Sequence, residues 1–77
     1  MPKRTSADPV AAAFGRAVRS ARRAQGLSVE ELARGIPRMD SGYLAAVERG
    51  AHAITIPTAK RVADALNMPL ADLLQEL

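Results

Sequence analysis

Two residue classes are scarce in this chain of 77 residues: it has no cysteine, and its only aromatic residues are Phe14 and Tyr43. Without cysteine there is no disulfide, no thiolate metal ligand and no thiol nucleophile. The lack of disulfides is compatible with the reducing cytosol. Because aromatic rings are so few, alanine, leucine and valine must fill the core. Such side chains suit closely packed helices better than a sheet, so the composition favours an all-α fold.

Long apolar segments are also missing. No stretch reaches the roughly 20 residues of a transmembrane helix, and the basic residues 1–6 lack the apolar run of a signal peptide. We therefore expect a cytoplasmic protein without a membrane partner. The length allows one domain with a thin core, so self-association would help to stabilise it.

Candidate catalytic groups are few. His52 is the only histidine, and no cysteine or second histidine is present to complete a metal site. Glu30 and Glu31 are adjacent on a predicted helix and face different ways, so they do not form an acid–base pair. The sequence also lacks a glycine-rich phosphate loop and a nucleophile spaced from a base. We therefore predict that the protein is not an enzyme and takes no cofactor, metal or small-molecule ligand.

Charge is distributed unevenly along the chain, whose net charge is +3. Residues 1–38 carry eight basic and three acidic side chains, whereas residues 39–77 carry three basic and five acidic ones. A basic half of this kind favours a polyanionic partner such as nucleic acid.

Start and stop signals divide the chain into five short helices. Four starts carry a side chain that can cap exposed amides, namely Asp8, Ser28, Asp40 and Thr55, and the fifth helix opens at Pro69. Ser28 and Glu31 have the spacing of a capping box. The first three helices stop near glycines, at Gly26, Gly35 and Gly50. The predicted helices span residues 9–25, 29–35, 41–49, 56–67 and 69–77; residues 1–8 are expected to form a flexible basic arm ahead of a single domain, 9–77.

Three segments resemble the lambda-repressor and Cro-like (XRE-type) helix-turn-helix family, in the family's order and spacing. Residues 26–33 look like the first helix of the motif, and residues 43–50, ending in Glu-Arg-Gly, look like the recognition helix. Residues 62–70, followed by two leucines, resemble the closing helices. Within the family, residues 39–44 and 53–56 look most like the small controller proteins of restriction–modification systems, although phage-type repressors and antitoxins share much of the pattern.

The resemblance implies a sequence-specific DNA-binding transcriptional regulator that acts as a homodimer on double-stranded DNA. Such a regulator would insert the helix of residues 41–49 into the major groove. An autoregulatory controller of a restriction–modification or phage-type operon fits the absence of a sensory domain. The alternative is a protein-interaction module, for example the antitoxin of a toxin–antitoxin pair, whose small-residue helix face binds a partner.

A helical rotation of about 100° per residue separates the two faces of this helix. Leu44, Val47 and Glu48 point inward. The predicted DNA contacts are the outward residues, the residues at the helix start and flank, and the cation of the preceding turn: Arg38, Asp40, Ser41, Gly42, Tyr43, Ala45, Ala46 and Arg49. The helix face itself lacks the Arg, Gln or Asn that usually read base edges. It therefore indicates either close approach to DNA with shape-based specificity or packing against another protein.

The turn before this helix, residues 36–39, is about one residue longer than usual for the family and contains Pro37. We expect a wider turn from which Arg38 projects. The exposed arginines of the first helix, Arg16, Arg19 and Arg23, fit a solvated face and phosphate contact equally well.

Two further predictions concern structure. The family resemblance implies an ion pair between Arg22 and Glu48 that links the first helix to the recognition helix. The leucines of the last helix exceed what one face can hide in so small a monomer, so we expect a dimer interface formed by Leu70, Leu73, Leu74 and Leu77, some of which must also close the core.

Overall fold

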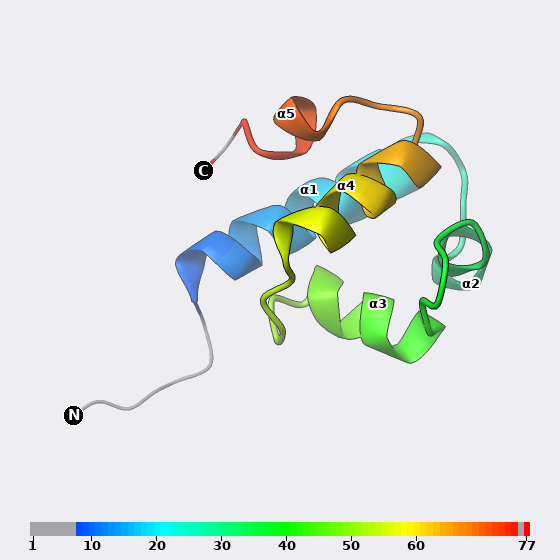
Figure 1. Ribbon diagram of the computed structural model, residues 1–77, viewed down its shortest axis with the longest axis horizontal. Coiled ribbons are helices and arrows are strands. Elements are labelled where there is room, and N and C mark those ends of the chain that lie inside the picture. Colours follow the sequence, from blue (N-terminus) through cyan, green and yellow to red (C-terminus); the bar gives the residue numbers. More distant parts are fainter. Residues whose placement is uncertain (1–7, 76) are drawn as a thin grey trace.

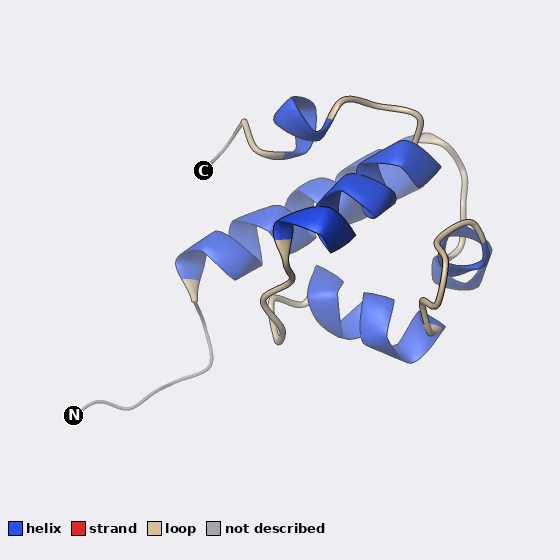
Figure 2. Ribbon diagram, viewed as in Figure 1, coloured by secondary structure: helices blue, strands red, loops and turns tan. Residues whose placement is uncertain are grey.

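The computed structural model describes residues 8–75 and 77. These residues form five helices: α1 (Pro9–Ala24), α2 (Val29–Arg34), α3 (Ser41–Glu48), α4 (Ile56–Ala65) and α5 (Leu70–Leu73), and they contain no strand (Figures 1 and 2). The predicted all-α, five-helix class is confirmed. Apart from Asp8, the predicted N-terminal arm lies outside the described residues. None of these helices combines the length and the apolar character that crossing a membrane requires.

The four predicted side-chain caps are all present. The Asp8 carboxylate accepts a hydrogen bond from the amide of Val10 (2.9 Å), and the Asp40 carboxylate accepts one from the Tyr43 amide in the first turn of α3. The Thr55 hydroxyl oxygen accepts a hydrogen bond from the Thr58 amide in the first turn of α4. At α2 the capping box is complete: Ser28 Oγ accepts from the Glu31 amide (3.0 Å), and Glu31 Oε1 accepts from the Ser28 amide (2.8 Å). Local chemistry thus determines where these four helices begin.

The last two helices end earlier than predicted. α4 stops at Ala65, because Asn67 takes a left-handed backbone conformation (φ 57°) that a right-handed helix cannot include. α5 is a single turn that stops at Leu73, so Leu74 and Leu77 lie beyond it. Pro69 offers no side-chain cap, and one turn is enough to bury Leu73 in the core.

The core is almost entirely aliphatic, as the scarcity of aromatic residues predicts. The largest fully buried side chains come from all five helices and the segment after α4: Val18, Leu32, Leu44, Val47, Val62, Leu66 and Leu73. Within it, α1 packs on α3 and α5, α2 packs on α3, and α5 packs on α4. α3 is therefore held by α1 and α2 at the edge of the helical assembly (Figure 1).

The contact between α1 and α3 is so close that it requires glycine. A Cβ atom on Gly15 would lie 2.3 Å from the carbonyl oxygen of Val47 and 2.7 Å from that of Glu48. Gly50, just after α3, has φ 78° and its Cβ would meet the backbone of Ala12 at 2.8 Å. The two backbones touch, which fixes the height of α3 above α1.

Candidate nucleic-acid interface

The segment between α2 and α3 is a tight turn at residues 36–39. The Met39 amide donates to the Ile36 carbonyl (3.1 Å), Pro37 occupies the second position, and Arg38 has a left-handed backbone (φ 61°). This is the pattern of a type II turn, in which the third position normally carries glycine or asparagine. The Arg38 side chain is exposed.

The helical rotation places most residues of α3 as predicted. Leu44, Val47 and Glu48 are buried. On the opposite side and its flanks, Gly42, Tyr43 and Arg49 are exposed, and Ser41 and Ala45 are half-buried.

The prediction that Ala46 faces outward is wrong, because its side chain is only 7% exposed. The loop after α3 turns back on the helix, since the amide of Ala51 donates to the carbonyl of Ala46 (2.9 Å). Tyr43, one turn earlier, stacks on the ring of His52 with the centroids 5.2 Å apart and an angle of 15° between the planes. These neighbours leave the small Ala46 methyl little free surface.

The same stack gives His52 a structural role that the sequence does not reveal. His52 belongs to the loop between α3 and α4, and its ring fixes the orientation of Tyr43 on the flank of α3. No spacing rule predicts a contact between a helix and the loop that follows it. The Asp40 carboxylate caps the helix that follows it, because its Oδ2 accepts a hydrogen bond from the Tyr43 amide (3.1 Å).

At the other end of α3, Arg22 and Glu48 form the pair that the family resemblance implies. Arg22 Nε lies 2.7 Å from Glu48 Oε2, and Nη2 lies 2.9 Å from Oε1, which is bidentate geometry. Arg22 Nη1 also donates to the carbonyl of Leu27 (2.8 Å). The hydrogen bond to Glu48 raises the pKa of the Arg22 guanidinium. Because Glu48 is 5% exposed, the pair fastens the C-terminal end of α3 to α1.

The remaining arginines of α1 lie on its exposed side. Arg19 Nε is 3.7 Å from Glu48 Oε1, with nearly half of the Arg19 side chain in solvent. Arg16 and Arg23 are exposed beside the segment that holds Met68 and Asp72. Their surroundings suit a solvated face, and they lie apart from the N-terminal end of α3.

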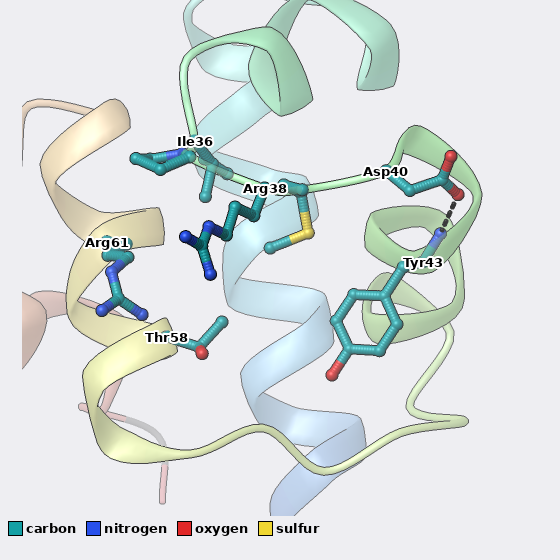
Figure 3. Close-up of a pocket in the computed structure, with 8 residues that line it drawn as sticks. Ile36, Arg38, Asp40, Tyr43, Thr58 and Arg61 are labelled. Atoms are coloured by element: carbon teal, nitrogen blue, oxygen red, sulfur yellow. Dashed lines mark hydrogen bonds between the residues drawn. The ribbon is translucent and has the colours of Figure 1, made fainter.

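A groove of about 730 Å³ opens beside that N-terminal end, between the turn and α4 (Figure 3). It is lined by Ile36, Pro37, Arg38, Met39, Asp40, Tyr43, Thr58 and Arg61. Thr58 and Arg61 are not among the binding residues predicted from the sequence. Their separation of three residues puts them on one face of α4, but only the packing of the chain shows that this face meets the turn.

The predicted leucine interface is altered by the structure. Leu73 is 1% exposed and belongs to the core, so it is unavailable to a partner. Leu70 and Leu74 are half-buried against the core, and only Leu77 is largely open, at 52% exposure.

A family model described as helix-turn-helix matches residues 18–73. Among solved structures, the chain is similar to the clp gene regulator ClgR of C. glutamicum, with 35% identity over 90% of this chain and 88% of that one and a TM-score of 0.83. It is also similar to the restriction–modification controller protein C.AhdI of Aeromonas hydrophila, with 33% identity over 82% of this chain and 94% of that one and a TM-score of 0.76.

A third similar structure is the DNA-binding domain of BldD from S. venezuelae, with 28% identity over 87% of this chain and 99% of that one and a TM-score of 0.78. No curated protein sequence matches the chain. The family match covers most of the chain and includes the turn and α3 described above. The chain therefore belongs to the lambda-repressor-like helix-turn-helix family of DNA-binding transcriptional regulators.

Proposed function

We propose that this chain is a homodimeric, sequence-specific regulator that controls its own operon, of the restriction–modification or phage type, by inserting α3 into the major groove of a palindromic site. The observation that carries the proposal is how α3 is held: an ion pair with a buried carboxylate joins its C-terminal end to α1, and its opposite face presents small or polar residues to solvent, with Tyr43 on the flank. A helix held in this way can enter a groove without rearrangement.

The exposed face of α3 suits close approach to DNA. Ser41 and Gly42 add little bulk, Ser41 can bond to a base edge or a phosphate, and the methyl group of Ala45 can contact a thymine methyl. No bidentate base reader lies on this face, so we expect much of the specificity to come from the shape and deformability of the site. Arg38 and Arg49, both exposed, would contact phosphates.

Dimerisation would place two α3 helices about 34 Å apart, one turn of DNA. Leu77 supports a contact at the C-terminal end of the chain, because it is a large apolar side chain left in solvent. Protein concentration would then control occupancy of the operator through the dimerisation equilibrium. Light scattering should report a dimer that Leu77→Arg weakens, whereas a monomer at high concentration would contradict this part of the proposal.

The direct test is selection of bound fragments from a random duplex library. We expect enriched sites with two-fold symmetry and half-sites one helical turn apart, and affinity that falls steeply with salt. The absence of any enriched duplex, together with salt-insensitive binding to one protein partner, would instead support the antitoxin-type alternative.

A further inference from the structure

The groove beside the N-terminal end of α3 brings together two arginines from distant parts of the chain. Arg38 comes from the turn and Arg61 from α4, and both guanidinium groups project into the same space (Figure 3). Within residues 8–75 and 77, no carboxylate forms an ion pair with either of them. Two neighbouring cations repel each other, and an anion between them would turn that repulsion into attraction.

The backbone of Arg38 points to a role for its side chain. At the third position of a type II turn, the backbone has a positive φ, here 61°. Glycine adopts this conformation without steric cost, whereas arginine destabilises the turn. The Arg38 side chain is exposed, and within residues 8–75 and 77 it forms no hydrogen bond or ion pair with another side chain. Strained backbone conformations are often found at functional residues. The strain at Arg38 therefore indicates that its exposed, charged side chain serves binding rather than stability.

Neutral donors complete the groove. Thr58 Oγ1 accepts a hydrogen bond from the Thr55 hydroxyl (3.1 Å), so the proton of the Thr58 hydroxyl remains available to a bound anion. Tyr43, held by its stack on His52, brings its hydroxyl to the same region. The one acidic residue, Asp40, turns its carboxylate toward the first turn of α3 and away from both guanidinium groups (Figure 3).

We propose that Arg38, Thr58 and Arg61 form a phosphate clamp on the DNA strand that borders the major groove occupied by α3. This inference rests on the proposed function. Tyr43 makes the two surfaces continuous, because it belongs to α3 and also lines the groove. The major groove is only about 12 Å wide, so backbone phosphates lie directly beside an inserted helix. The clamp would add affinity and fix the register of the protein while leaving the choice of bases to α3.

The test compares Arg61→Gln with Lys60→Gln, measuring affinity for one selected duplex across a series of salt concentrations. Both changes remove one positive charge from α4, but Lys60 lies outside the groove and pairs with Asp64 (2.6 Å). For Arg61→Gln we expect affinity about tenfold weaker at low salt and a log–log salt slope reduced by about 1. For Lys60→Gln we expect smaller changes in both.

A second variant, Arg38→Gly, guards against an effect on folding. Glycine relieves the left-handed backbone, so the melting temperature should equal or exceed that of the original protein. Affinity for the duplex should nevertheless fall about tenfold, because one charged phosphate contact is lost. Opposite directions for stability and binding cannot arise from partial unfolding.

Two negative outcomes can be told apart. If the original protein binds the duplex tightly and Arg61→Gln matches Lys60→Gln in affinity and slope, the clamp is overturned and the proposed function stands. If the original protein binds no duplex at any salt concentration, the proposed function itself fails and the clamp fails with it.

Discussion

The two ends of α3 use the same kind of side chain in opposite surroundings. At the C-terminal end, the Arg22 side chain is only 11% exposed, is bidentate on Glu48 and also donates to the carbonyl of Leu27. At the N-terminal end, Arg38 and Arg61 are exposed and line an open groove. A buried arginine must be paired, because an isolated charge away from water is costly. An exposed arginine contributes little to the fold and stays available to an anion.

This difference divides the helix into a fixed end and a binding end. The Arg22–Glu48 pair need not stabilise the fold more than apolar residues would. Its bidentate geometry instead restricts the angle and the height of α3 on α1. The exposed arginines set no helix geometry and instead determine the potential beside it. Substitutions at the fixed end should therefore have the largest effects on stability.

Glu48→Ala should destabilise the domain by about 3–5 kcal/mol, because it leaves the Arg22 charge, whose side chain is mostly shielded from water, without its carboxylate partner. The measurement is the free energy of unfolding in urea. Arg19→Ala is the matched control: it removes an arginine 3.7 Å from the same carboxylate, but one nearly half exposed, and should cost about 0–1 kcal/mol.

The double variant Arg22→Met with Glu48→Leu distinguishes pairing from packing. Replacing both charges by apolar side chains should be less harmful than Glu48→Ala alone. Equal stability of Glu48→Ala and the original protein would refute the buried pair.

Gly15→Ala tests the same α1–α3 contact through the backbone. The added Cβ would press on the carbonyls of Val47 and Glu48, which belong to α3 and cannot swing aside, so one helix must move. We expect a loss of about 1–3 kcal/mol in unfolding free energy. Gly35→Ala is the control, since its Cβ would find neighbours only at 3.5 Å and beyond. Equal effects of the two changes would show that α3 is not seated on α1 as described.

The smallest expected effect concerns an exposed glutamate, in contrast to the buried Glu48. The hydrogen bond from the Ser28 amide lowers the pKa of Glu31. A lowered folded pKa means that the stabilisation is present above the unfolded pKa and is lost as pH falls through the folded one. When the pH is lowered from about 5 to about 3, the melting temperature of Glu31→Gln should therefore decrease slightly less than that of the original protein. An identical pH profile would contradict the capping box.

The fold could be predicted largely because helix starts are local. Side-chain caps such as Asp8 and Ser28 act within one turn, so the sequence alone placed them. Helix ends were harder to predict from the sequence. Asn67 adopts a left-handed conformation that many asparagines do not adopt. The length of α5 depends on how much of Leu73 the core can bury.

The binding end was predicted less completely, for reasons of tertiary structure. A helical wheel treats α3 in isolation, so it could not foresee that the following loop returns to leave Ala46 little exposed. Arg61 was missed because its role depends on which face of α4 meets the turn. The left-handed backbone of Arg38 carries no sequence signal beyond the preceding proline.

The most direct test of the account is to place a negative charge on the exposed face of α3. Ala45→Glu puts a carboxylate where the phosphates of a bound duplex would converge, without altering the core or the Arg22 pair. Ala24→Glu is the control, because it adds the same charge at the exposed end of α1. We predict that Ala45→Glu abolishes specific binding of the selected duplex while its melting temperature stays near that of Ala24→Glu. Binding by Ala45→Glu as tight as that of the control would contradict the insertion of α3 into DNA.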